Sequence, residues 1–375
     1  MNETQENLIY LLYCAVNGIT PDKARVQTMD LENLYKQAKF HKVRAAVCIA
    51  LERAGVQHED FHESKIKAIR KNIYLDMERA AITAELENLG IWYMPLKGSI
   101  LKDLYPENGM REMSDIDILF DEQFAEKVRE IFEEKGYTTT EFGDGHHDTY
   151  QKEPILNFEM HTHLFGKGHS EVFNAYYDDT MRLMLHDEDN NFGYHFSDED
   201  FYVFMTAHEY KHYSSSGTGI RSLLDCYVFC KEKGDTLNWD YITEQCRQLE
   251  ISEFEQERRQ LAMKTFSSDK FPKLSESEQE MLTYYLMAGA YGSMDSMISS
   301  RIKKTGSKGL LGKIKYVWNR LFPPIENMRQ FYPEFFENKL LLPLLPFYRL
   351  SRIFTVQKDF VKSELKALFK YKGNF

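Results

Sequence analysis

The sequence predicts an α+β protein in which a small mixed sheet is flanked by α-helical regions on its N-terminal and C-terminal sides. Apolar residues recur at helical spacing up to about residue 90 and again after about residue 170. Between these regions the pattern changes to short apolar runs of strand length with one amphipathic helix among them. The chain has 375 residues, 43% of them hydrophobic, so it can bury a large core.

The N-terminal region, residues 1–90, is predicted to be helical. Residues 31–55 are typical of two helices, and a longer helix is expected from about Glu59 to Leu89. Gly90 follows it at the position where a glycine commonly ends a helix. Six apolar residues of the long helix recur every three or four positions and form one apolar stripe: Ile66, Ile69, Ile73, Met77, Ala80 and Ala84.

Four apolar runs predict the strands of the sheet. They are IWYMPL (91–96), DIDILF (115–120), YTTTEF (137–142) and ILNFEMHTH (155–163). An amphipathic helix is expected from about Gln123 to Lys135, between the second and third runs. After residue 170 helical periodicity is expected to continue to the end without further strands, and Ser197 is the expected N-cap of a helix.

The predicted organisation has four segments. They are an N-terminal helical region (1–90), the sheet region (91–170), a helical domain (171–300), and a basic linker with a C-terminal helical segment (301–375). Residues 301–320 include seven lysines or arginines and no acidic residue. This stretch is either a solvated linker and helix face or a contact for a polyanionic substrate.

Charge and cysteine content exclude several classes of protein. A net charge of −11 argues against nonspecific coating of nucleic acid, because phosphate neutralisation needs an excess of Lys and Arg. The five cysteines are scattered, which favours a reducing compartment over a disulfide framework. The N-terminal segment lacks the basic flank of a signal peptide, and no segment reaches the ~18 to 20 apolar residues of a membrane helix. We therefore expect a cytoplasmic protein without membrane association.

A pair of acidic residues carries the first indication of chemistry. In a strand successive side chains alternate, so Asp115 and Asp117 should project together while Ile116 and Ile118 enter the core. Two neighbouring carboxylates repel each other unless a divalent cation lies between them. Oxygen ligands combined with nucleotide phosphates are the environment that Mg²⁺ prefers.

Two further features flank this pair. Lys97, Gly98 and Ser99 follow the first strand and open a short helix, where glycine lets backbone N–H groups approach a phosphate and Ser99 adds a hydroxyl donor. In the last strand, Glu159 lies on the polar face, opposite the apolar face that enters the core. The strand therefore offers a third carboxylate toward the same side.

A Gly-Ser turn, an Asp-x-Asp strand and a later strand with one acid together resemble the signature of the DNA polymerase β nucleotidyltransferase superfamily. The match extends along most of the chain. LKGSILKDLYPENGMREMSDIDILF, followed by FEMHTHLF, AHEYKH, GIRSLLD and the closing LFPP, FYP and LLP motifs, resembles the family of uncharacterised bacterial nucleotidyltransferases. This resemblance implies a polymerase β-like palm as the fold of the sheet region.

The resemblance also implies a magnesium-dependent nucleotidyltransferase. Such an enzyme moves a nucleoside monophosphate, AMP by default, from a nucleoside triphosphate, ATP by default, to an acceptor. Asp115 and Asp117 would hold two Mg²⁺ ions, with Mn²⁺ as a possible substitute. Glu159 would complete the second metal site and help deprotonate the acceptor.

The same resemblance implies the nucleotide contacts. Gly98 and Ser99 would bind the β and γ phosphates, and Lys97 or Arg111 would stabilise the pyrophosphate leaving group. The acceptor is not identified by the sequence. The acidic net charge favours a small molecule or a protein over a long nucleic acid.

Four more residues are candidate contacts to nucleotide or acceptor: His161, His208, Lys211 and His212. The last three belong to HEYKH, which also matches the helical zinc motif H-E-x-x-H, where the glutamate is a general base. A zinc hydrolase is therefore an alternative, with Glu232 as a third ligand by position only.

The sequence leaves room for two more interpretations. Glu159, His161 and His163 share one strand face, and His146 and His147 precede it, so a transition metal is another possible occupant. A noncatalytic protein that kept the fold and a nucleotide site is the third functional class. Metal analysis and nucleotide binding distinguish these possibilities from the nucleotidyltransferase.

Overall fold

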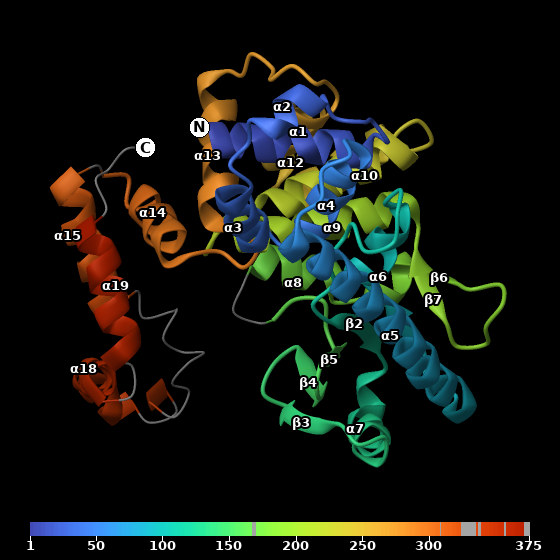
Figure 1. Cartoon of the computed structure of the whole chain (residues 1–375). Helices are drawn as coiled ribbons and strands as arrows, with labels where there is room; N and C mark the ends of the chain where they lie inside the picture. Colours follow the sequence, from blue (N-terminus) through green and yellow to red (C-terminus); the bar gives the residue numbers. More distant parts are fainter. Residues whose placement is uncertain (167–169, 308, 324–334, 337–338, 356–357, 371–375) are drawn as a thin grey trace. The chain divides into compact units, whose positions relative to one another are not determined.

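The computed structural model describes residues 1–166, 170–307, 309–323, 335–336, 339–355 and 358–370 (Figure 1). Lys308, the last residue of the LFPP motif and the whole FYP motif lie outside the described residues. The chain divides into two compact units, one of residues 1–210 and 220–279, the other of residues 211–219 and 280–375. Across the described ranges, no helix combines the length and apolar character needed to cross a bilayer.

The N-terminal part of the first unit is helical, as predicted. Its helices are α1 (Glu3–Val16), α2 (Lys23–Gln27), α3 (Leu31–His41), α4 (Arg44–Arg53) and α5 (Glu59–Leu89). Helices α3 and α4 confirm the two helices expected over residues 31–55. Helix α5 ends at Gly90, whose φ of 70° is the left-handed conformation that glycine adopts without steric cost.

The buried face of α5 differs from the predicted apolar stripe. Ile73 and Met77, two members of that stripe, are 47% and 62% exposed. The buried residues are Phe61, Ser64, Ala68, Asn72, Leu75, Ile82 and Leu86. The prediction was wrong because this helix packs partly through small and polar residues, and Asn72 Nδ2 donates a hydrogen bond to the Arg111 carbonyl. Apolar periodicity does not detect such a face.

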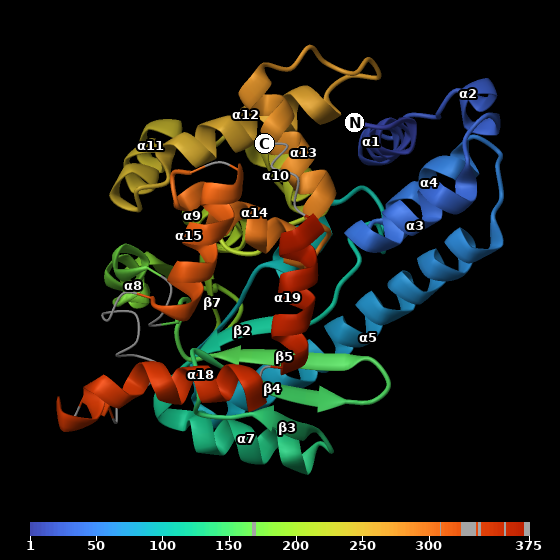
Figure 2. The same ribbon diagram turned by 90° about the vertical axis from the view of Figure 1, so that its left-hand side faces the viewer.

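The sheet is mixed, as predicted, with the strand order β1-β2-β5-β4-β3 (Figure 2). The strands are β1 (Tyr93–Pro95), β2 (Ile116–Phe120), β3 (Thr138–Glu141), β4 (His147–Lys152) and β5 (Leu156–His161). Strands β2 and β5 are parallel, and the other neighbours are antiparallel. Strand β4 was not predicted, because its sequence HDTYQK is mostly polar and lacks an apolar run.

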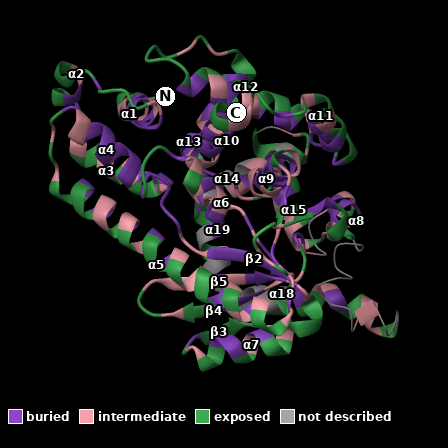
Figure 3. Cartoon of the chain, turned by 90° about the vertical axis from the view of Figure 1, so that its right-hand side faces the viewer, coloured by how far each residue is buried: buried purple, intermediate pink, exposed green. Residues whose placement is uncertain are grey.

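One face of the sheet packs on α5 and on α7 (Ala125–Glu134). Ile118, Phe158 and Met160 are fully buried there, and the rings of Phe132 and Tyr150 stack with centroids 4.2 Å apart. Burial of each such side chain stabilises the fold by about 1.5 to 3 kcal/mol. Strand β2 is buried along its whole length (Figure 3). The alternation of the strands leaves the polar side chains on the opposite face.

The segment between the first two strands is bound by side chains from three helices. It begins with α6 (Gly98–Leu101) and the 3-10 turn η1 (Lys102–Leu104), which together confirm the short helix expected after β1. Glu112 accepts a hydrogen bond from Arg44 at 2.6 Å, and the Glu112 carbonyl accepts one from Arg221 at 3.0 Å. Lys71 Nζ donates to the Ser114 carbonyl at 2.8 Å. These contacts fix the backbone immediately before Asp115.

The rest of the first unit is helical apart from one short hairpin. The elements are the 3-10 turn η2 (Glu122–Phe124), α8 (Glu171–Tyr177), η3 (Thr180–Leu183), α9 (Asp198–Tyr213), α10 (Ile220–Lys233), α11 (Trp239–Gln248) and α12 (Ser252–Phe266). Ser197 is the N-cap of α9, as predicted, and its Oγ accepts the Asp200 N–H at 3.0 Å. The hairpin, β6 (Met184–His186) with β7 (Tyr194–Phe196), contradicts the prediction of no strands after residue 170. Its three-residue strands are too short to produce an alternating pattern.

The second unit contains most of α13 (Glu276–Ala288) and the C-terminal helices. These are α14 (Met294–Lys304), α15 (Gly309–Leu321), the 3-10 turn η4 (Lys339–Leu344), α18 (Leu345–Thr355) and α19 (Lys358–Lys370). Glu364, which is buried, lies 3.9 Å from Arg301 and 3.2 Å from Arg320. Part of the positive charge of residues 301–320 is therefore compensated within this unit.

Candidate active site

The polar face of the sheet gathers the predicted acidic residues. Strand register places Asp117 beside Glu159 in the parallel pair β2–β5, and His147 beside His161 in the antiparallel pair β4–β5. Because alternate residues share a face, Asp117, Glu159 and His161 project from the same side of the sheet. The structure thus brings together residues that are more than 40 positions apart in the sequence.

Asp117 is the centre of this group. Its Oδ1 atom lies 2.6 Å from Lys97 Nζ and 2.9 Å from His161 Nε2, and the carboxylate is almost fully buried. Glu159 Oε2 lies 3.8 Å from the same His161 nitrogen. Ligand atoms of Asp117, Glu159 and His161 lie within 4.8 Å of one another, close enough to surround one metal ion.

The charges of the group are strongly coupled. Burial raises the pKa of Asp117, but the positive charge of Lys97 and the hydrogen bond from His161 outweigh it and hold that pKa well below its usual range. Burial, together with the negative charges of Asp117 and Asp115, raises the pKa of Glu159 to about 7. Burial and the neighbouring Lys97 charge lower the pKa of His161 to about 4, so its ring is neutral near pH 7.

Asp115 lies one residue before β2, with Arg111, Lys97 and Arg221 as its charged neighbours. Burial and the charge of Asp117 raise the pKa of Asp115. Among the described residues, the group with mutually close ligand atoms contains Asp117, Glu159 and His161 and not Asp115. Asp115 is therefore a neighbour of the group, and its role in metal binding stays a prediction.

The turn after β1 is conformationally constrained. Lys97 has a φ of 47°, an unfavourable conformation for a residue with a side chain, and precedes α6 directly. A Cβ atom added at Gly98 would lie 2.6 Å from Arg111 Nη1 and 2.7 Å from Met113 Cε, so a larger residue there would displace the ends of these two side chains. Ser99 is buried, at 3% exposure. Phosphate contact by Gly98 and Ser99 stays a prediction.

Arg111 lies beneath this turn in a buried polar cluster. Its Nε and Nη2 atoms donate to the two carboxylate oxygens of Asp225 at 2.9 and 3.0 Å, and the Tyr105 hydroxyl donates to Asp225 at 2.6 Å. The two donors of the Arg111 guanidinium are therefore bound to Asp225, a residue of α10. Sequence reasoning did not find this pair, because the two residues are 114 positions apart. Pyrophosphate contact by Arg111 stays a prediction.

The HEYKH segment forms part of α9. Glu209 is buried and its Oε2 accepts a hydrogen bond at 2.8 Å from Arg258 Nη1, a side chain with no exposed surface. His208 belongs to the first unit, and Lys211 and His212 belong to the second. Within the described residues, these histidines join no group of three potential metal ligands. Substrate contact by His208, Lys211 and His212 stays a prediction.

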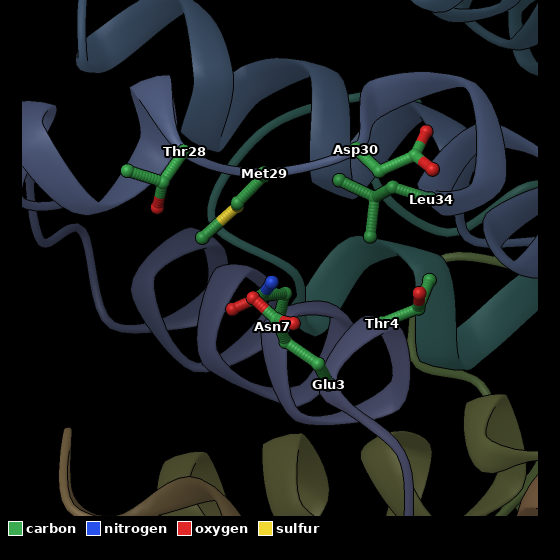
Figure 4. A pocket seen from close by; sticks show the side chains of 7 residues that line it. All are labelled: Glu3, Thr4, Asn7, Thr28, Met29, Asp30 and Leu34. Carbon is green, nitrogen blue, oxygen red and sulfur yellow. The ribbon is translucent and has the colours of Figure 1, made fainter.

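Two hollows in the described part of the chain lie outside the sheet. One of about 180 Å³ is lined by residues of α1 and of the segment that leads into α3 (Figure 4). Asp30, on its rim, accepts the Asn33 N–H as the N-cap of α3. The other, of about 580 Å³, lies between α4 and the start of α5. Neither contains a predicted site residue.

Comparison with known proteins gives one result. The family described as Uncharacterised nucleotidyltransferase matches residues 27–267, more than half of the chain. The matched region includes the sheet, with Lys97, Asp117, Glu159 and His161. No curated protein and no solved structure matches the sequence.

Proposed function

Since the chain belongs to the uncharacterised nucleotidyltransferase family, we propose that it transfers a nucleoside monophosphate from a nucleoside triphosphate, ATP by default, to an acceptor. One observation carries the proposal. Asp117 and Glu159 lie side by side on parallel strands, with Asp115 directly before the first of them. This arrangement concentrates negative charge where a divalent cation and a triphosphate would complete the site.

The carboxylates fit Mg²⁺ as the metal. Carboxylate oxygens are its preferred protein ligands, and Asp117 already binds a cation, the ammonium group of Lys97. The raised pKa of Glu159 reflects its burial and, after that, the negative charges of Asp117 and Asp115, whose repulsion a second cation would relieve. When bound, Mg²⁺ would neutralise the triphosphate and polarise the phosphoryl group. Asp117 and Glu159 would hold it, with Asp115 as the further predicted ligand.

Glu159 is the proposed proton acceptor for the acceptor hydroxyl. A general base works best when its pKa lies near the working pH, and that of Glu159 is raised to about 7. Lys97 keeps the neighbouring Asp117 ionised, so the two acids differ in proton affinity. Asp117 is therefore proposed to bind the cation only, and Glu159 to bind it and also to take part in proton transfer.

The triphosphate is proposed to bind at the turn after β1. Gly98 and Ser99 begin α6, and Lys97 places one positive charge beside them. Ser99 is buried, so its hydroxyl reaches a phosphate only if the turn adjusts. A small molecule or a protein is the expected acceptor, since the chain carries a net charge of −11.

The test is calorimetric binding of nonhydrolysable ATP, GTP, CTP and UTP analogues, with and without Mg²⁺. We expect Mg²⁺-dependent binding of at least one analogue by the native protein, and its loss in Asp115→Asn/Asp117→Asn. Glu122→Gln is the matched control, because it removes one exposed carboxylate, 60% exposed, outside the group. Absence of binding to all four analogues would overturn the proposal.

A transfer assay separates a catalyst from a nucleotide-binding protein. Incubation with α-³²P-labelled nucleotide and a mixture of small-molecule and protein acceptors should yield labelled product. Glu159→Gln should reduce the rate by about 100-fold or more while nucleotide binding persists. Binding without any transfer, in native protein and variant alike, would favour a noncatalytic nucleotide-binding protein.

A further inference from the structure

His161 contributes a buried ring nitrogen that the proposed transfer does not use. The side chain is 2% exposed, and its Nε2 atom lies 2.9 Å from Asp117 Oδ1. An ionised carboxylate only accepts hydrogen bonds, so Nε2 of the neutral ring carries the proton and donates it. Nδ1 then presents a lone pair, and this atom has no hydrogen-bond partner in the described part of the chain. Buried acceptors almost always have a hydrogen-bond donor or another ligand, so Nδ1 of His161 is a candidate ligand atom.

Two further histidines lie beside the His161 ring. His147 is the cross-strand partner of His161, with ring centroids 5.1 Å apart, and the His146 ring lies 5.7 Å from the His161 ring. One nitrogen from each of the three rings lies within 4.8 Å of the other two. The cluster therefore has the composition and proximity of a three-histidine metal site.

The backbone holds this cluster in place. The His146 carbonyl accepts hydrogen bonds from the Thr162 N–H at 3.0 Å and the His163 N–H at 3.2 Å. These bonds join the segment before β4 to the end of β5. A Cβ atom built at Gly166 would lie 3.0 Å from His146 Nδ1, so a glycine leaves room for that ring. The exposed His163 is outside the cluster.

We propose that His146, His147 and His161 bind a transition-metal ion, Zn²⁺ by preference, with Nδ1 of His161 as one ligand. Neutral imidazoles suit Zn²⁺, whereas Mg²⁺ prefers oxygen ligands. Ligand nitrogens around tetrahedral zinc lie about 3.4 Å apart, given Zn–N bonds of about 2.05 Å. The three ring nitrogens, now within 4.8 Å of one another, would approach to that spacing on binding the ion, and water would occupy the fourth position.

The charges around the cluster favour a cation. Glu141 Oε2 lies 3.8 Å from His147, and Asp117 and Glu159 flank His161. Lys97 is the opposing charge, and its ammonium group is bound to Asp117. The net local charge from these four groups is negative, so a divalent ion gains attraction on entering the site.

The metal would position a residue of the proposed active site. An ion on Nδ1 of His161 fixes the proton on Nε2, which donates to Asp117. The zinc site thus orients one of the carboxylates that hold Mg²⁺. This last consequence rests on the proposed function, whereas zinc binding itself does not.

The experiment measures zinc directly, in the full chain. Protein stripped with a chelator is titrated with Zn²⁺ by calorimetry, and with Co²⁺ by visible absorption, which reports tetrahedral nitrogen ligation. We expect one equivalent to bind. His146→Ala/His147→Ala should weaken binding by at least 100-fold, and His163→Ala, the matched control, should bind as the native protein does. Circular dichroism of the metal-free variants verifies that they fold.

A second variant distinguishes the two metal groups. Asp117→Asn/Glu159→Gln removes the carboxylates and retains all three histidines, so it should still bind Zn²⁺. Retained binding there, combined with loss of nucleotide binding, would support the zinc site even if no transfer is detected. No zinc binding by the native protein, or binding lost in the carboxylate variant and kept in the histidine variant, would overturn the proposal.

Discussion

The ammonium nitrogen of Lys97 lies 2.6 Å from Oδ1 of Asp117, and the two side chains are only 18% and 7% exposed. A lysine thereby neutralises the carboxylate at the centre of the polar sheet face. The pair is also constrained through the backbone, since Lys97 has a φ of 47°. The conformation is costly and is maintained by the surrounding contacts.

Removal of this cation should destabilise the metal-free protein. Lys97→Met leaves Asp117 as a buried charge without its ion-pair partner, which costs about 3 kcal/mol in the free energy of unfolding. Urea denaturation in the presence of a chelator measures the loss. Lys67→Met, which removes an exposed partner of Glu63, is the control and should cost less than about 1 kcal/mol.

A double substitution verifies the cause. Asp117→Asn in the Lys97→Met background removes the uncompensated charge and should recover most of the lost stability. If the two substitutions are simply additive, Lys97 does not act through Asp117.

The pH dependence of stability should report Glu159. Its folded-state pKa is raised to about 7 from a usual value of 4.5, by burial and by repulsion from Asp117 and Asp115. A raised pKa means that the folded protein binds the proton more tightly than the unfolded chain. Stability from this group is therefore fully present below pH 4.5 and is lost as the pH rises through 7.

Glu159→Gln removes this titration. The unfolding free energies of native and Glu159→Gln protein, measured in chelator at several pH values, should differ increasingly in favour of the variant as the pH rises from about 5 to about 8. Addition of Mg²⁺ should reduce that difference, since a bound cation offsets the repulsion. A pH-independent difference would contradict the raised pKa.

The sequence predicted the strands that carry the acids because these strands follow a simple alternation. Ile118 and Met160 enter the core, and Asp117 and Glu159 project to the other side. The order of the strands in the sheet was not predictable in this way. Strand β4 lies between β3 and β5, yet its polar sequence gives no strand signal.

The partners of the site residues were less predictable still. Lys97 was expected to contact a nucleotide, and its contact in the structure is Asp117, 20 positions away. Such a pair depends on where two loops and a strand meet in three dimensions, which no local pattern encodes. The prediction of an apolar stripe on α5 was wrong for a related reason. Asn72 is buried there and donates a hydrogen bond to the loop before β2.

The Arg111–Asp225 pair provides a test of the role of Arg111. Asp225→Asn removes the ion-pair partner of the buried guanidinium and should lower the free energy of unfolding by about 3 kcal/mol. If Arg111 serves only this contact, the nucleotide affinity of the folded variant should stay within about twofold of the native value. Calorimetry below the unfolding transition measures it. A gain in affinity would show instead that Asp225 competes with the triphosphate for Arg111.

Replacement of Glu209 tests whether the HEYKH segment has a structural role or forms the site of a zinc hydrolase. Its carboxylate is paired at 2.8 Å with Arg258, and both side chains are buried, so Glu209→Gln should lower the free energy of unfolding by about 3 kcal/mol. A general base in an H-E-x-x-H site would behave differently, since its replacement by glutamine abolishes hydrolysis while the fold stays intact. Denaturation and a metal-dependent peptide-hydrolysis assay on the same variant separate the two cases. Unchanged stability together with lost hydrolysis would support the zinc hydrolase interpretation, because the Arg258 contact would then have no structural role.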